Sequence, residues 1–374
     1  MSINETRKQY KKIVEKLRGS RKISALIFSK KFFEKHNAFF IPTIPLLLEV
    51  LSILPSATKM FHSNGEIASF ALSVFFVIGH SQVGAKILSV FMNIANIDAI
   101  LEWFHQLHQV KENILVSRIY AEGLNKTQRT SEFFMRLVVL TYGLSTLLAV
   151  IFYNISDRVI FQVPFIDENN GVVHRLGGSI ALVYNIYNVL VSECTVIFIG
   201  IYFIGVLNIL SDLLEKLNKS SNIAVAGDLL RSIVPLHIEI LSKFNDFCEV
   251  FYFVFSIQLF TSGLLLLFNL YLLMQSVTNF FYWAAFISLF AQFALFCLFG
   301  QIIYNRSERI FTDLYHTKWY EMEIKDQKIL LLMMKMSQKT FGLKAAGMYD
   351  INLVVFDQVI KLCFSTCTIL YSLT

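Results

Sequence analysis

Two histidines, His105 and His108, have the spacing in this sequence that most resembles part of a metal site. They lie three residues apart in the segment IDAILEWFHQLHQVKENI, whose apolar residues recur at helical intervals, so one helix would turn both rings to the same side. A zinc site takes three or four ligands, and no third ligand with suitable spacing is nearby. We therefore interpret the pair as the hydrated face of an amphipathic helix, and we expect no metal and no cofactor.

The sequence also lacks the patterns that mark common enzymes. Neither a Gly-rich phosphate loop nor a nucleophile elbow occurs. The net charge of +6 is compatible with nucleic-acid binding, but the basic residues stand at the flanks of apolar segments. We expect neither catalytic residues nor a nucleic-acid partner.

Ionisable side chains inside long apolar segments are a stronger functional signal, because hydrocarbon penalises a buried charge heavily. Glu49 and Glu193 each occur in such a segment. Asp357 and Lys361 occur four residues apart in another, where they share a helix face and can form a pair. One interpretation is a polar path for ions. The other is hydrogen bonding inside a helix bundle, which we favour for Glu49, whereas both remain open for Asp357 and Lys361.

Aromatic residues are interleaved with small polar ones in the halves of four apolar segments that we place on the outer side of a membrane. Such a lining suits a small, mostly apolar ligand that a few hydroxyl groups orient. Ordinary packing and an interfacial aromatic belt explain the same pattern, and the belt alone accounts for Tyr282 and Trp283. The candidate ligand-binding residues are Phe70, Ser73, Val74, Val77, Tyr142, Ser145, Thr146, Ala149, Tyr153, Tyr184, Tyr187, Asn188, Val191, Tyr282 and Phe286.

The last apolar segment mixes hydroxyl-bearing and bulky apolar residues from Cys363 to Leu373. A pore needs both kinds, because hydrated ions require a polar lining and a hydrophobic constriction closes by dewetting. The alternative is a helix that uses its small residues to pack closely in a bundle.

The elements that carry these residues are expected to be membrane spans. Hydrophobic residues make up 55% of the 374 residues and charged residues only 16%, and the mean hydropathy is +0.57. A soluble core could not bury this much apolar surface, and a sheet with open edges is excluded from lipid. Since a span needs about 20 apolar residues, we predict an all-α, multi-pass membrane protein. Its seven transmembrane helices are expected at about 38–58, 66–93, 133–153, 179–210, 250–276, 280–304 and 350–372.

The distribution of basic residues predicts the orientation of these spans. If the N-terminus is inside, the inside segments hold 27 of the 33 Lys and Arg residues and the outside segments hold 3. Basic loops stay in the cytoplasm. The bias therefore predicts an inverted topology, with the N-terminus in the cytoplasm and the C-terminus outside. The inside segments 94–132, 211–245 and 308–344 have apolar residues at helical spacing, so we expect a cytoplasmic helical extension.

We expect a single domain over 1–374. It comprises a basic cytoplasmic N-terminal arm (1–37), the first six helices with the candidate ligand site (38–304), and an inside segment with the seventh helix (305–374). The first 36 residues contain no apolar core of signal-peptide length, so no cleaved signal is expected. Four of the five cysteines lie in apolar segments, which argues against a disulfide framework.

The C-terminal part of the chain carries an ordered run of residues that is similar to the insect odorant receptors. Together with seven spans and a cytoplasmic N-terminus, this run makes the chain resemble that family over its whole length. The specific motifs are confined to about 295–374. They are Cys297, Phe299-Gly300, Ser307, Tyr315, Trp319-Tyr320, Gln338, Ala346-Gly347, Phe356 and Ser365-Thr366.

The resemblance implies an odorant-gated, non-selective cation channel in the plasma membrane of a sensory-neuron dendrite. Such receptors form heterotetramers with the odorant receptor co-receptor around one pore, which helix seven of each subunit lines. The cytoplasmic ends of helices four to seven would hold the subunits together, and a small apolar odorant would bind in the outer half of the bundle. By the same resemblance, Leu370 and Leu373 match the gate and Thr366 matches the polar lining.

Three other classes of protein are alternatives to this resemblance. A gustatory receptor-type channel is one alternative, although the Thr-Tyr and later Gln-Phe with which that branch ends are absent from the end of this sequence, as is the Ser-Tyr-Ser common near the end of odorant receptors. A seven-helix G-protein-coupled chemoreceptor would have an outside N-terminus and Asp-Arg-Tyr and Asn-Pro-x-x-Tyr motifs, which this sequence lacks. A transporter would commonly show inverted repeats and broken helices, and neither is found.

Overall fold

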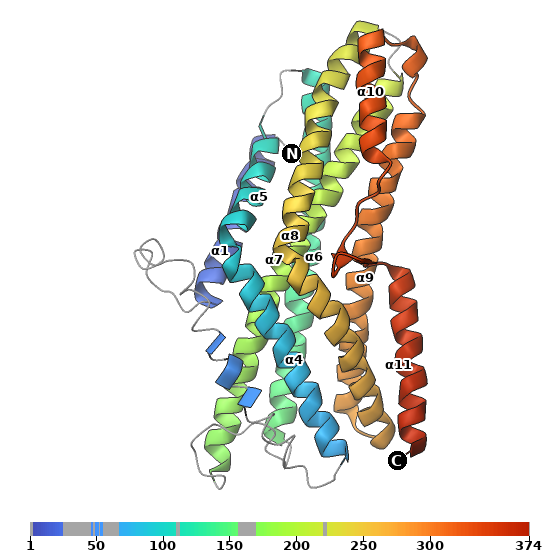
Figure 1. Ribbon diagram of the computed structural model, residues 1–374. Helices are drawn as coiled ribbons and strands as arrows, with labels where there is room; N and C mark the ends of the chain where they lie inside the picture. The colour runs from blue at the N-terminus through green and yellow to red at the C-terminus, as the bar shows by residue number, and fades with distance from the viewer. Residues whose placement is uncertain are drawn as a thin grey trace.

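The computed structural model is a bundle of long α-helices (Figure 1). It describes residues 3–24, 46–47, 49–51, 53–54, 67–109, 113–155, 170–219 and 223–373. The β-structure in these ranges is one short hairpin. The elements are α1 (Ile3–Ser24), α4 (Ile67–Met92), α5 (Ile94–Leu107), α6 (Ile114–Ile155), α7 (Gly171–Lys219), α8 (Ile223–Gln275), α9 (Phe280–Tyr315), η1 (Trp319–Glu321), α10 (Ile324–Ser337), β1 (Lys344–Ala345), β2 (Tyr349–Asp350) and α11 (Leu353–Leu373).

Six of these helices, α4, α6, α7, α8, α9 and α11, are long and apolar enough to cross a membrane. Each coincides with or contains one of the spans predicted from the sequence, which confirms the prediction of an all-α membrane protein. The first predicted span, at 38–58, lies outside the described residues except for short helical pieces at 46–47, 49–51 and 53–54.

The helices α6 to α9 are much longer than a bilayer requires. They contain 42, 49, 53 and 36 residues, whereas about 20 residues span the hydrocarbon core. This length agrees with the helical extension predicted for the inside segments. In the inside segment 94–132 the helical part is not a continuation of α4, because α5 begins as a separate helix after Asn93. The side-chain amide of Asn93 donates to the Ser89 carbonyl oxygen (3.0 Å), and its backbone leaves the helical conformation.

The core of the bundle lies around α7, which packs against α1, α4, α6, α8 and α9. Side chains on every side of α7 are buried along its second half, which explains why its sequence is apolar without an amphipathic pattern. Phe198, Tyr202 and Phe203 contact rings from α1, α5 and α8 there. These aromatic contacts join the N-terminal helices to the long helices that carry the candidate ligand site.

A hairpin and one glycine set the position at which α11 begins. The strands β1 and β2 pair antiparallel, and their turn has positive φ at Ala346 (50°) and Gly347 (69°). Gly300 of α9 lies against the backbone just beyond this hairpin. A Cβ atom at residue 300 would stand only 2.1 Å from the carbonyl oxygen of Ile351. The two segments can pack this closely because residue 300 has no side chain.

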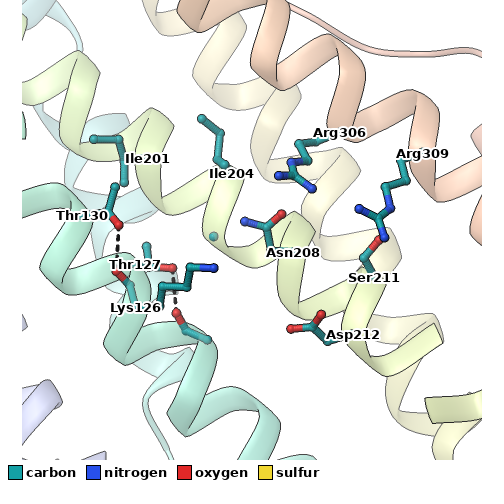
Figure 2. Close-up of a pocket in the computed structure, with 12 residues that line it drawn as sticks. Lys126, Thr127, Thr130, Ile201, Ile204, Asn208, Ser211, Asp212, Arg306 and Arg309 are labelled. Atoms are coloured by element: carbon teal, nitrogen blue, oxygen red, sulfur yellow. Dashed lines mark hydrogen bonds between the residues drawn. The ribbon is translucent and has the colours of Figure 1, made fainter. Parts of the chain in front are cut away.

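A cavity of about 220 Å³ lies between α6, α7 and α9 (Figure 2). It is near the points where three of the predicted spans end on the side that we predict to be cytoplasmic. Its wall combines apolar side chains, such as Ile201 and Ile204, with charged ones, such as Lys126 and Arg306. None of the sequence patterns predicts this cavity.

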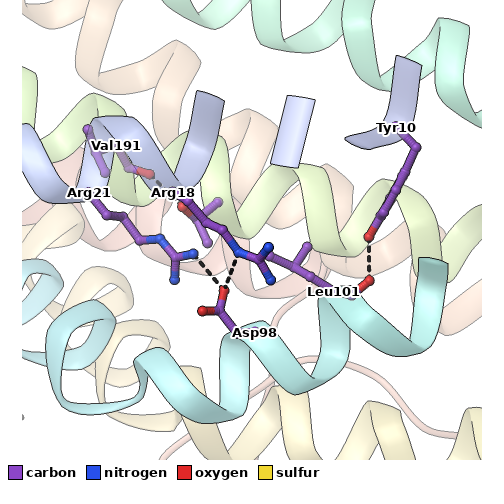
Figure 3. Close-up of polar contacts among 7 residues, drawn as sticks. Tyr10, Arg18, Arg21, Asp98, Leu101 and Val191 are labelled. Atoms are coloured by element: carbon purple, nitrogen blue, oxygen red, sulfur yellow. Dashed lines mark hydrogen bonds and ion pairs between the residues drawn. The ribbon is translucent and has the colours of Figure 1, made fainter. Parts of the chain in front are cut away.

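The N-terminal segment, which we expected to be a basic arm, forms the helix α1 and is docked on the bundle (Figure 3). One face of α1 is buried, including Tyr10 and Arg21. The Tyr10 hydroxyl donates to the Leu101 carbonyl oxygen (2.6 Å), and the Asp98 carboxylate accepts from Arg21 (2.8 Å) and Arg18 (3.3 Å). A charge as buried as Arg21, whose side chain is 3% exposed, needs such a partner. These contacts hold α1 against α5.

Replacing Asp98 with asparagine should weaken this docking. The substitution removes the negative charge beside the buried Arg21 guanidinium, and losing a charge-assisted hydrogen bond costs about 1–3 kcal/mol. We expect a clear fall in the thermal unfolding midpoint of the detergent-solubilised protein. The matched control is Glu122→Gln, which breaks an exposed pair with Arg118 and should change stability by under about 1 kcal/mol. Equal shifts for the two variants would contradict the docking role of Asp98.

Candidate functional site

The candidate ligand-binding residues lie on α4, α6, α7 and α9, in the half of the bundle whose end also contains the α8–α9 turn and the C-terminus (Figure 1). Ser73, Asn188 and Val191 are buried, and Phe70 is exposed at 39%. The side chain of Tyr153 lies outside the described part. The remaining candidates are half-buried, namely Val74, Val77, Tyr142, Ser145, Thr146, Ala149, Tyr184, Tyr187, Tyr282 and Phe286.

Three of the α7 candidates contact the C-terminal end of α1. The Tyr184 hydroxyl donates to the Ser24 carbonyl oxygen (2.9 Å), and the Tyr187 hydroxyl donates to the Ser20 carbonyl oxygen (3.3 Å). The Asn188 side chain accepts from the Ser24 hydroxyl. Their polar groups therefore have structural partners already, and a ligand role for them stays a prediction.

An ion pair lies deeper in the bundle, on the same helices as the candidates. Lys86 of α4 donates to Glu193 of α7 (2.5 Å), and the Gln292 amide of α9 donates to the same carboxylate oxygen (3.4 Å). Tyr142 of α6 lies near enough to interact electrostatically with Glu193. The side chain of Lys86 is 2% exposed and that of Glu193 is 13% exposed. All four helices that carry candidates thus converge on one carboxylate.

Sequence reasoning identified Glu193 as an intramembrane charge but did not predict its partner. Lys86 and Glu193 are 107 residues apart, and no local spacing rule connects such positions. Lys86 lies near the predicted inner end of the span 66–93, where a lysine side chain is expected to reach water. The only sequence signal was that each residue is an isolated charge in an apolar segment, which requires a partner elsewhere in the bundle.

Glu49 is paired within the bundle, which agrees with the interpretation we favoured. His80 Nδ1 lies 2.7 Å from its Oε1 atom, and the Asn185 amide lies 3.4 Å from the same His80 nitrogen. Both Glu49 and His80 are buried. This group joins α4 and α7 to the described part of the first predicted span.

The last helix, α11, has one face packed on the bundle and one polar face that is exposed. The packed face includes Cys363, whose thiol contacts the Gly263 carbonyl oxygen, and Cys367. Five exposed polar residues recur at intervals of three or four and so form one stripe along the helix. We call them the α11 polar stripe; they are Asp357, Lys361, Ser365, Thr368 and Ser372.

The charged pair of the α11 polar stripe is more exposed than is usual for charges in a membrane-spanning helix. Lys361 donates to Asp357 (2.6 Å), with side chains that are 75% and 58% exposed. A pair this exposed would meet hydrocarbon if this face of α11 contacted lipid, at a high energetic cost. The stripe therefore suits contact with water or with another polar protein surface.

The residues predicted to form the pore and gate lie on a different row of α11. Thr366 is half-buried, Leu370 is 37% exposed, and the side chain of Leu373 lies outside the described part. Leu370 follows Cys367 by three residues, so it continues the packed face rather than the α11 polar stripe. Their assignment remains a prediction, and α11 would have to turn about its axis for this row, in place of the α11 polar stripe, to face a pore.

The two histidines do not form the hydrated helix face that their spacing suggested, because His105 is half-buried and His108 is buried against the bundle. Arg7 donates to His105 Nε2 (3.4 Å), and the Nδ1 atom of His108 lies 2.9 Å from the Phe104 carbonyl oxygen. Burial lowers the pKa of His108 to about 4, because the charged ring would lose its hydration. Within the described ranges, no group of three or more His, Cys, Asp or Glu side chains is placed to hold a metal ion.

Comparisons with known proteins show which family and which solved structures this chain resembles. The sequence matches the family described as 7tm Odorant receptor over residues 67–364. It is 28% identical over 135 residues to Odorant receptor 49a of Drosophila melanogaster, a match that covers 34% of this chain and about one third (33%) of that relative.

Solved structures show the same fold. The insect olfactory receptor OR5 from Machilis hrabei in complex with eugenol aligns with a TM-score of 0.76 at 13% identity, over 98% of this chain and 100% of that one. A second structure of OR5 aligns with a TM-score of 0.76 at 14% identity, over 97% and 98% of the two chains.

Proposed function

This chain belongs to the 7tm odorant receptor family, and from that premise we propose that it is the odorant-sensing subunit of a ligand-gated, non-selective cation channel. Its partner would be the odorant receptor co-receptor, with which it would form a heterotetramer in the plasma membrane of sensory-neuron dendrites. The observation that carries the channel proposal is the α11 polar stripe, which is exposed in the single chain. A central pore would give this stripe the aqueous contact that lipid cannot provide.

The ligand site proposed for this channel is the outer half of the bundle between α4, α6, α7 and α9. Half-buried Tyr142, Ser145 and Phe286 would contact a small apolar odorant there. Because Tyr184 and Tyr187 already bond to α1, orientation of the ligand would fall mainly to other hydroxyl groups. Ser145 is the best candidate, since its hydroxyl makes no hydrogen bond within the described ranges.

An aromatic contact chain offers a route from this site to the pore helix. Phe286 and Phe290 of α9 have ring centroids 5.9 Å apart, and Phe290 meets Phe356 of α11 at 5.3 Å. A ligand that shifts the outer end of α9 would thereby move the ring against which α11 packs. Such a ligand opens the channel only if it binds the open arrangement more tightly than the closed one. A shift from mostly closed to mostly open needs about 5 kcal/mol of that preference.

The first test is ligand-evoked current in cells that express this chain with its co-receptor. The odorant panel should include eugenol, which is bound in the related OR5 structure. We expect currents for some odorants that depend on the presence of this chain. If no odorant evokes such current although the chain reaches the cell surface, the proposed function is contradicted.

The ligand site is tested by two substitutions at Ser145. Replacing it with alanine removes one neutral hydrogen bond, worth about 0.5–1.5 kcal/mol, so the half-maximal concentration of a hydroxyl-bearing odorant should rise severalfold. Replacing it with leucine should abolish the response by filling the site. The control is Thr141→Ala, because Thr141 is exposed and donates to the Leu137 carbonyl oxygen of its own helix. Unchanged dose–response curves for both Ser145 variants would exclude this location.

A further inference from the structure

The cavity between α6, α7 and α9 gathers more positive than negative charge (Figure 2). Lys126 of α6 and both Arg306 and Arg309 of α9 point towards the side of α7 that carries Asn208 and Asp212. All three cations interact electrostatically with the Asp212 carboxylate. The residues that line this space of about 220 Å³ include three cationic side chains and one acidic one, so its wall carries an excess of positive charge.

These cations are incompletely neutralised by the protein. Arg309 has a nearby acceptor in Asp313 at 3.5 Å, on the next turn of its own helix. Neither Lys126 nor Arg306 makes an ion pair or a side-chain hydrogen bond within the described ranges. An arginine with no bound carboxylate retains its planar set of donors, which matches the oxygen atoms of a phosphate group.

The two ends of the cavity differ in polarity. Ile201, Ile204 and the close approach of Gly205 to Thr127 form an apolar part on the membrane side. Lys126, Asp212 and Arg306 lie a few residues beyond the predicted spans 133–153, 179–210 and 280–304, respectively. If the orientation predicted from loop charges holds, the charged part stands at the level of the inner-leaflet headgroups. Basic pockets between helices on this side of a membrane suit anionic lipid headgroups.

We propose that this cavity binds the phosphate-bearing headgroup of an anionic phospholipid of the inner leaflet. Arg306, Arg309 and Lys126 would contact the phosphate, and the acyl chains would leave along the apolar side near Ile201 and Ile204. The Asp212 carboxylate is an acceptor beside the phosphate position. It therefore favours a headgroup whose own hydroxyl groups can donate to it, as in phosphatidylinositol phosphates. The inference uses the predicted orientation but not the channel function.

The test uses the purified full-length chain and a fluorescent, short-chain phosphatidylinositol phosphate as the probe. We expect saturable binding that Arg306→Gln weakens tenfold or more and Lys126→Gln weakens severalfold. Lys126 is exposed, so the Lys126→Gln variant should fold. It can test the proposed site even if the Arg306→Gln variant does not fold. Arg231→Gln is the control, because Arg231 is an exposed cation on α8 that pairs with Asp228.

Three competitors separate the source of the phosphate. Short-chain phosphatidylcholine should not displace the probe, and inositol bisphosphate without acyl chains should compete at least tenfold more weakly than the unlabelled lipid. Inorganic phosphate should be weaker still. Unchanged binding by both the Arg306 and the Lys126 variants would overturn the proposed site. Competition by inositol bisphosphate or inorganic phosphate as strong as that of the lipid would overturn the membrane source. The binding assay does not measure odorant-evoked current, so failure of the channel proposal would not change the conclusion about the lipid site.

Discussion

Replacing Lys86 with methionine is expected to lower the stability of this receptor by about 3–5 kcal/mol, the usual cost of leaving a buried charge without its partner. Methionine matches the length of the lysine stem but removes the ammonium group that lies 2.5 Å from Glu193. The carboxylate would keep only the longer contact from Gln292. Thermal unfolding followed by size-exclusion chromatography in detergent should show a lower midpoint. Labelling of intact cells should show less of the protein at the cell surface.

A second substitution separates loss of the pair from loss of packing. Lys86→Met combined with Glu193→Gln removes both charges and should recover much of the stability, because neutral polar groups are less costly to bury than a lone carboxylate. Lys361→Met is the matched control, since its pair with Asp357 is exposed. If the double variant is no more stable than Lys86→Met, the ion pair is not what stabilises this part of the bundle.

Replacing Gly300 with alanine should disturb the junction between α9 and α11. The new methyl group would stand 2.1 Å from the Ile351 carbonyl oxygen, which is backbone and cannot rotate away. Overpacking of this kind costs about 1–3 kcal/mol, and it would displace the segment from which α11 starts. We expect a lower unfolding midpoint together with strongly reduced ligand-evoked current.

Gly143→Ala provides the control for this substitution. Gly143 is also inside a membrane-spanning helix, but a Cβ atom there meets no described atom within 4 Å. Alanine has a higher helix propensity than glycine by about 1 kcal/mol, so this variant should be as stable as the wild type or more so. A Gly300 variant that unfolds and conducts like the wild type would show that the α9–α11 contact is not required.

The fold was largely predictable because hydrocarbon imposes few solutions. Six long apolar segments had to become helices, and each of the six described helices coincides with or contains the span expected from hydropathy. The extension of α7 to Lys219 and of α9 to Tyr315 followed from apolar residues at helical spacing. The docking of α1 did not follow, because its high charge suggested a solvated arm. The buried face of α1 becomes apparent only from the contacts that Tyr10 and Arg21 make with α5.

The candidate site was less predictable because it depends on which faces of the helices meet. The pair of Lys86 and Glu193 joins residues far apart in the sequence, so only the packing of α4 against α7 reveals it. The same limit applies to α11. Composition identified a helix suited to a pore, but its hydroxyl groups occur on more than one row. The structure distinguishes the packed row of Cys363 and Cys367 from the exposed α11 polar stripe.

The most direct test of the channel proposal is cysteine accessibility along α11 in cells that also express the co-receptor. Ser365→Cys and Thr368→Cys should react with a membrane-impermeant cationic thiol reagent applied with odorant, and the current should fall. The native Cys363 and Cys367 are buried and should give little background. Leu362→Cys and Ile369→Cys, which are exposed on another face, should leave the current unchanged. If the reagent blocks the Leu362 and Ile369 variants while sparing those at Ser365 and Thr368, the α11 polar stripe does not line the pore.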